Sequence, residues 1–103
     1  MKTFALKLYI TGKTARSELA IHNLTRICED ELYGDYVIDV IDVMEHPQLA
    51  EEQKIVATPT LVKVLPEPLR RVIGDMSESE KVLLGLDIVI VKNDNIIKKE
   101  VES

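Results

Sequence analysis

Cys28 is the one residue of this chain that could supply a thiol nucleophile. Thiol–disulfide exchange starts from a reactive thiolate, and the sequence contains no Cys-x-x-Cys motif to provide a resolving partner. Cys28 also falls on the apolar stripe of a predicted helix, where a free cysteine usually acts as a small buried hydrophobic residue. We therefore do not expect redox chemistry, and a redox-sensing role for Cys28 is the lesser alternative.

The other residue types that support catalysis are scattered along the sequence. His22 is predicted on the polar side of a helix and His46 precedes a proline, so no metal ligand set can be assembled. Asp39 and Asp42 are three positions apart in a strand, an odd spacing that sends their carboxylates to opposite faces. Thr11-Gly12-Lys13-Thr14 lacks the earlier glycine of a phosphate-binding loop. No catalytic residue, metal or cofactor is predicted.

Length and charge restrict the class of protein further. The 103 residues are 46% hydrophobic and 30% charged, with a net charge of −5. This length suits a single domain over residues 1–103, and the acidic balance disfavours nucleic-acid binding. No stretch approaches the roughly 18 apolar residues of a membrane span, and no secretory signal is present. We expect one cytoplasmic α/β domain without a membrane span.

Hydrophobic periodicity predicts the elements that must position any functional surface. The first half is expected to form a strand over Phe4–Ile10, an amphipathic helix from Ala15 to about Leu32 capped by Thr14, a strand over 36–43 covered on both faces, and a short helix over 47–55. The second half is expected to form a hairpin of strands 61–65 and 69–73, then a helix with a Ser77–Glu80 capping box and buried Val82, Leu83 and Leu86. The predicted order is βαβαββα, with a tail over about 93–103 that is expected to fray.

Local preferences conflict in the last element. Gly85 lies inside the predicted helix, and residues 87–91 have the β-branched density of a strand. Such preferences differ by only a few tenths of a kcal/mol per residue, so tertiary packing or a partner can decide between helix and strand. Helix and strand both remain possible for this segment. A small free-energy difference between two packings is the condition for fold switching.

Lys63, Arg70 and Arg71 form a basic cluster in an acidic chain. Hairpin pairing is expected to bring Lys63 near the two arginines. The cluster is either an ordinary solvated face or a surface for an acidic protein partner. Tyr9 and Tyr36 are expected to be exposed, as packing residues or as interface anchors.

Thr58-Pro59-Thr60, just before the third strand, completes a resemblance to thioredoxin-like domains. In that fold a cis-proline occupies this place, so we expect a cis Thr58–Pro59 bond in a thioredoxin-like form. Redox members carry a cysteine after the first strand, where this chain has Thr11-Gly12-Lys13-Thr14.

Three long segments resemble the KaiB family. They are LKLYITG (6–12), VIDVMEHPQLAEEQKIVATPTLVKVLPEPLRRVIGD (40–75) and EKVLLGLD (80–87). The resemblance implies a metamorphic, non-enzymatic protein with an oligomeric ground state, dimeric or tetrameric, ordered βαββααβ. It also implies a rare thioredoxin-like monomer that binds a KaiC-type ATPase ring. We expect the ground state to be the arrangement observed, because it is the more populated one.

The resemblance also implies which residues bias the fold switch and which contact the ring. Those that bias the switch are Phe4, Pro59, Gly85, Asp87 and Ile90. Those that contact the ring are Lys54, Ala57, Thr58, Lys63, Arg70, Arg71 and Asp75. The strand edge at 36–39 is the implied docking site for KaiA, and a sensor histidine kinase is the implied competitor. Two alternatives are a stress-response adaptor acting with KaiC outside a full oscillator and, with less support, a thioredoxin-like or glutathione-transfer enzyme.

Overall fold

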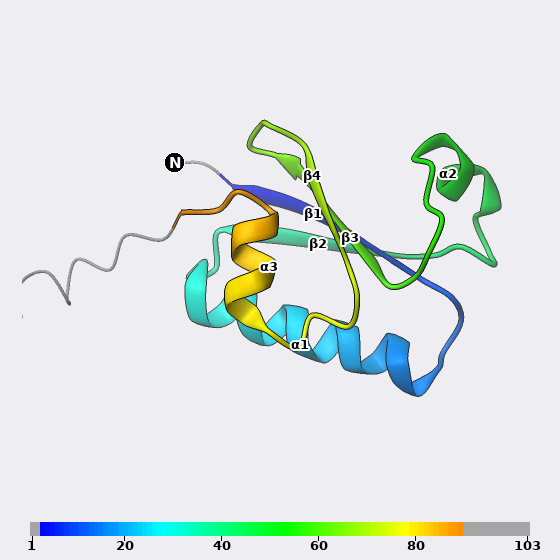
Figure 1. The fold of residues 1–103 in the computed structure, drawn as a ribbon, viewed down its shortest axis with the longest axis horizontal. Coiled ribbons are helices and arrows are strands. Elements are labelled where there is room, and N and C mark those ends of the chain that lie inside the picture. Colours follow the sequence, from blue (N-terminus) through cyan, green and yellow to red (C-terminus); the bar gives the residue numbers. More distant parts are fainter. Residues whose placement is uncertain (1–2, 90–103) are drawn as a thin grey trace, which may run out of the picture.

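The computed structural model describes residues 3–89, which form one mixed sheet with helices (Figure 1). The elements are β1 (Phe4–Ile10), α1 (Ala15–Glu31), β2 (Tyr36–Asp42), α2 (Pro47–Glu52), β3 (Thr60–Leu65), β4 (Arg70–Ile73) and α3 (Ser79–Gly85). This is the predicted order βαβαββα. The main boundary difference is that α2 ends at Glu52 rather than at Ile55, because Lys54 adopts a left-handed φ of 55°.

The sheet has the strand order β2-β1-β3-β4. β1 and β2 run parallel and are joined through α1, as the βαβ prediction required, whereas β3 is antiparallel to both β1 and β4. β2 and β4 are therefore the two edges of the sheet, and they run in the same direction. The pairs Leu8–Leu61 and Tyr9–Thr60 show that alternate residues of β1 and β3 share a face.

α1 is amphipathic in the way that the sequence predicts. The Thr14 side chain accepts a hydrogen bond from the Ser17 backbone N–H at 3.0 Å and so caps the helix. The predicted apolar stripe is buried; it comprises Ala20, Leu24, Ile27, Cys28 and Leu32. This stripe covers one face of the sheet.

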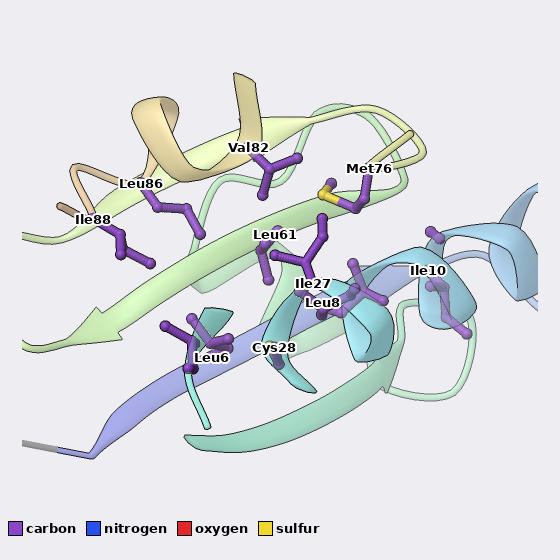
Figure 2. Close-up of a cluster of buried hydrophobic side chains, with 13 residues drawn as sticks. Leu6, Leu8, Ile10, Ile27, Cys28, Leu61, Met76, Val82, Leu86 and Ile88 are labelled. Carbon is purple, nitrogen blue, oxygen red and sulfur yellow. The ribbon is translucent and has the colours of Figure 1, made fainter. Parts of the chain in front are cut away.

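The main core lies between that face and the two helices α1 and α3. Figure 2 shows how side chains from β1, β3, α1 and the segment after β4 converge there; those labelled are Leu6, Leu8, Ile10, Ile27, Cys28, Leu61, Met76, Val82, Leu86 and Ile88. Every one of them is buried. Removing this apolar surface from water is the principal stabilising contribution to the fold.

The opposite face of the sheet carries a smaller cluster. Tyr9, Ile41 and Val62 are buried there, with Ile55 from the segment after α2 packed against them. The prediction that Tyr9 is exposed is therefore wrong: its exposure is 1%, because this face is partly covered as well. The cover is incomplete, so the expectation that β2 is buried on both faces is also wrong, and Val37 is 59% exposed at the uncovered end.

α3 begins later than the sequence predicts. Glu78 is its N-cap residue and makes no side-chain capping bond, so the predicted Ser77–Glu80 capping box does not form. The Ser77 N–H instead donates to Asp75 Oδ1 at 3.1 Å, within a turn that buries Met76. The prediction of the apolar side is confirmed, since Val82 and Leu86 are buried and Leu83 packs beside them.

The arrangement is the thioredoxin-like one, so our expectation of the ground-state order βαββααβ is wrong for this structure. Residues 87–89 are not a strand; Asp87 turns with a φ of 60° and Ile88 enters the core. Burial of Val82, Leu86 and Ile88 on the α1 face outweighs the local strand preference. Ile90 and the tail at 93–103 lie outside the described residues.

A contact of Gly85 gives a testable consequence. A Cβ at this position would lie 2.6 Å from Val72 Cγ2, so Gly85→Ala gains helix propensity of about 1 kcal/mol but must displace Val72. We expect Gly85→Ala to stabilise the fold by about 1 kcal/mol more in a Val72→Ala background than in the wild type. Denaturant unfolding of the four proteins measures this coupling, and equal effects in both backgrounds would contradict the contact.

Candidate partner-binding surface

The loop before β3 and the loop after β1 meet at one end of the sheet. The Thr58–Pro59 bond is cis, as predicted for a thioredoxin-like form. Thr58 Oγ1 lies 2.6 Å from Thr11 Oγ1, and the Gly12 N–H donates to Asp42 Oδ1 at 3.0 Å. A shallow cavity of about 190 Å³ opens here, lined by Thr11, Val43, Ala50 and residues 55–58. Its polar groups are hydroxyls and backbone, so it offers a docking surface and no nucleophilic thiol.

Three of the predicted contact residues border this cavity or adjoin it. Ala57 and Thr58 line its wall, and Lys54 is exposed just before it. Arg71 joins them from β4, because its Nη1 donates to the Gln53 carbonyl at 2.9 Å. The fold therefore gathers Lys54, Ala57, Thr58 and Arg71 on one side of the molecule.

The basic cluster is divided by the pleat of the hairpin. Lys63 pairs with Arg70 and Val62 pairs with Arg71, so the two arginines point to opposite faces. Both arginines are exposed, whereas Lys63 is only 1% exposed. Hairpin pairing therefore brings Lys63 near both arginines, as expected, but the Arg71 side chain is on the other face because neighbouring strand residues alternate between faces.

Lys63 is a buried cation on the α3 side of the sheet. Its Nζ donates to the Pro66 carbonyl at 2.9 Å. Burial lowers the pKa of Lys63 below its ordinary value; the charge of Asp87 opposes that effect and the charge of Arg70 adds to it. In this arrangement the ammonium of Lys63 contacts its own chain, and its role as a partner contact stays a prediction.

Asp75 lies in the turn between β4 and α3, next to the cis-proline loop. Its carbonyl accepts a hydrogen bond from Asn23 Nδ2 of α1 at 2.9 Å, and the neighbouring Gly74 N–H donates to the Pro59 carbonyl at 2.9 Å. Asn23 is 7% exposed and Asp75 is half-buried, so this polar contact is partly buried. Sequence reasoning missed Asn23, because a polar residue on the border of an apolar stripe gives no signal of its partner 52 residues away.

The positions implied to bias switching surround the core. Phe4 packs at the start of β1, Pro59 is buried at the cis bond, and Gly85 ends α3 against Val72. Asp87 follows in a positive-φ turn, with its charge acting on Lys63. Phe4 and Pro59 lie at opposite ends of the paired strands β1 and β3, and Ile90 lies outside the described residues.

The structure offers no support for thiol chemistry. Cys28 is 1% exposed on the buried side of α1, away from the loop after β1. Burial, with a contribution from the charge of Glu29, raises the pKa of Cys28 to about 12. Within residues 3–89 no three His, Cys, Asp or Glu side chains converge as metal ligands, and none of the helices there is long and apolar enough to cross a membrane.

The state of Cys28 predicts low thiol reactivity. We expect iodoacetamide at pH 8 to alkylate Cys28 at least about 100-fold more slowly in the folded protein than in urea, because the buried thiol is protonated and covered. Mass spectrometry of timed samples measures the rates. Fast labelling of the folded protein would contradict the burial of Cys28.

Since the folded pKa of Cys28 is raised, the stability of the protein is also expected to fall as pH rises above about 9, and Cys28→Ala should lessen that fall.

The burial of Lys63 predicts a pH-dependent penalty. A lysine whose pKa is lower in the folded than in the unfolded state destabilises the fold most at a pH where both states are protonated. This destabilisation disappears as pH rises toward the unfolded pKa of 10.5. We expect Lys63→Met to match or exceed wild-type stability at pH 7, with the difference shrinking by pH 10. Urea unfolding across this range measures it, with Lys13→Met as the exposed control. A difference that grows with pH would contradict this account.

Comparisons with known proteins agree in sequence and in fold. The KaiB domain family matches residues 7–88. Circadian clock protein KaiB3 of Synechocystis sp. is 60% identical over 89 residues, which cover 86% of this chain and 87% of that protein. Circadian clock oscillator protein KaiB1 of the same organism is 52% identical over 101 residues, covering 98% of this chain and 93% of the relative.

Solved structures show the fold alone, since their sequence identity is low. The N-terminal domain of Synechococcus elongatus SasA matches with a TM-score of 0.70 and 22% identity, over 84% of this chain and 86% of that one. Mitochondrial thioredoxin 3 of Saccharomyces cerevisiae matches with a TM-score of 0.66 and 20% identity, over 84% and 79% of the two chains. The fold is thioredoxin-like, and the named sequence relatives are circadian clock proteins. This chain belongs to the KaiB family.

Proposed function

We propose that this protein is a non-enzymatic clock adaptor that binds a KaiC-type ATPase ring in its thioredoxin-like arrangement. When bound, it modulates phosphorylation of the ring and recruitment of KaiA or of a sensor histidine kinase. The observation that carries the proposal is the packing of residues 76–88. Their local preferences are divided between helix and strand, yet they form a helix and a turn on the sheet face that α1 covers. This packing leaves Lys54, Arg70 and Arg71 exposed on an acidic chain.

The contact surface is proposed to combine the loop around the cis-proline with the exposed arginines of β4. Ala57 and Thr58 form part of the wall of a shallow cavity, and Lys54 and Arg71 place positive charge beside it. A ring surface with complementary acidic groups would be attracted to these cations. Asp75 would extend the contact from the turn after β4.

The same fold is proposed to exchange with an oligomeric arrangement, dimeric or tetrameric, in which the last third of the chain repacks. Gly85, Asp87 and the undescribed Ile90 are in the segment that would change. If the ring-competent form were about 1% populated, apparent affinity would fall about 100-fold, equivalent to about 2.7 kcal/mol. Binding would then begin slowly, since the ring selects a minor state.

The partners are proposed to share this one domain. The free edge of β2, with Val37 59% exposed, is the docking site proposed for KaiA. The fold likeness to the SasA domain supports competition between two thioredoxin-like domains for one ring surface. A cytoplasmic location is proposed together with these partners. The buried thiol of Cys28 argues against the alternative of a thioredoxin-like enzyme.

Ring binding gives the direct test. We expect capture of this chain by a KaiC-type ring to depend on the nucleotide bound to the ring, with an onset rate that levels off as ring concentration rises. Arg70→Glu should weaken the complex about 10-fold or more, because it reverses an exposed charge whose Nη1 bonds, within residues 3–89, only to the neighbouring Leu69 carbonyl. Surface plasmon resonance measures both effects.

The matched control is Arg26→Glu, which makes the same charge change on the exposed side of α1. It should leave ring binding within about twofold of wild type, because it lies away from the cis-proline loop and β4. Amide NMR spectra of both variants establish that the fold is retained. An absence of nucleotide-dependent capture, or equal weakening by both substitutions, would overturn the proposal.

A further inference from the structure

Asn23 is a polar side chain on the buried side of α1. It is 7% exposed, and its neighbours one helical turn away, Ala20 and Ile27, are apolar and buried. Its Nδ2 donates to the Asp75 carbonyl at 2.9 Å, in the turn between β4 and α3. A buried amide that lacks a partner is unfavourable, so Asn23 favours an arrangement of the chain that supplies one.

The turn that Asn23 contacts has a strained backbone. Gly74 has a φ of 131° and Met76 a φ of 64°, and a residue with a side chain is disfavoured in this left-handed region. Such a conformation persists only where its surroundings hold it. Met76 is nevertheless 3% exposed and belongs to the main core, just before α3. The position of α3 therefore depends on the contacts that hold this turn.

Three hydrogen bonds hold the turn, and one of them comes from a distant helix. The Ser77 N–H donates to Asp75 Oδ1 at 3.1 Å, within the turn itself. The Gly74 N–H donates to the Pro59 carbonyl at 2.9 Å, on the cis-proline loop. The third bond is the one from Asn23. Through this one turn, Asn23 supports both the packing of α3 and the loop proposed to contact the ring.

The two ends of the Asn23–Asp75 bond lie in parts of the chain that would behave differently in an exchange of arrangements. The orders βαβαββα and βαββααβ share their first three elements, so α1 is common to both. Asp75 lies in the last third, which is proposed to repack. The bond therefore stabilises the thioredoxin-like arrangement relative to the other one.

We propose that Asn23 is a positioning residue for ring binding, whose side-chain amide holds the turn between β4 and α3 and so raises the population of the arrangement that the ring selects. The inference rests on the proposed function and adds to it a residue that acts from inside the molecule. Loss of the amide is expected to lower that population about 10-fold, as for other buried hydrogen bonds. Apparent ring affinity falls by the same factor, because only the competent fraction binds.

An engineered disulfide measures this population without the ring. A Cβ at Gly85 would lie 3.9 Å from Val72 Cβ, within the range of a disulfide, so Val72→Cys with Gly85→Cys can close a bond in the thioredoxin-like arrangement. In a Cys28→Ala background, the glutathione ratio at half-oxidation gives the effective concentration of the two thiols, even when the competent form is rare. We expect Asn23→Leu to lower this effective concentration about 10-fold at one fixed chain concentration.

Two further variants separate the lost hydrogen bond from repacking of α1. Asn23→Ala also lacks the donor but is smaller than asparagine, so it should lower the effective concentration as Asn23→Leu does. Thr25→Val is the matched control, because it removes a half-buried hydroxyl whose bond to the Ile21 carbonyl, at 2.8 Å, lies within α1. It should stay within about twofold of the parent, since α1 is common to both arrangements.

Ring binding distinguishes positioning from direct contact. In the chain without the engineered cysteines, surface plasmon resonance should show that Asn23→Leu slows association about 10-fold and leaves dissociation within about twofold, because it changes how often the competent form is available. In the oxidised Val72→Cys, Gly85→Cys chain the arrangement is locked. There Asn23→Leu should bind the ring as its Asn23 parent does.

An effective concentration that Asn23→Leu leaves unchanged, or a 10-fold loss of ring affinity that persists in the locked chain, would overturn the inference. If the locked parent itself fails to bind the ring, the proposed function is wrong, and the disulfide still reports whether Asn23 sets the balance between the two arrangements.

Discussion

The packing of the segment after β4 against the face already covered by α1 is the contact on which the rest of the structure depends. Met76, Val82, Leu86 and Ile88 reach Leu8 and Leu61 there and close the main core. Without that packing, α3 would be a helix of 7 residues ending in glycine, far below the length at which isolated helices are stable. Its conformation is therefore set by the surface that it covers.

This dependence explains why polar contacts gather at the two ends of the segment. The turn before α3 is tied to α1 by Asn23 and to the cis-proline loop through Gly74. After α3, Asp87 turns the chain so that Ile88 is buried, and its charge acts on the buried Lys63. A conformational change of this segment would have to break both sets of contacts together, which favours two discrete arrangements over a continuum.

The pleat of the hairpin also determines which charges are available to partners. Lys63 is withdrawn into the core, while Arg70 and Arg71 point to opposite faces. Arg71 lies with Lys54 and the cis-proline loop, at the end of the sheet where thioredoxin-like proteins with redox activity carry a thiol. Here that place holds the hydroxyls of Thr11 and Thr58, which cannot exchange a disulfide.

The sequence alone determined the element order, the apolar stripe of α1, the parallel βαβ unit, the cis-proline position and the absence of a reactive thiol. These follow from periodicity, capping and residue type, which act locally. Tertiary structure decided what those rules leave open. It chose the helix for residues 79–85, placed Tyr9 and Lys63 in buried positions, and joined Asn23 to Asp75. Each outcome depends on surfaces brought together from distant parts of the chain, and local preferences of a few tenths of a kcal/mol cannot encode them.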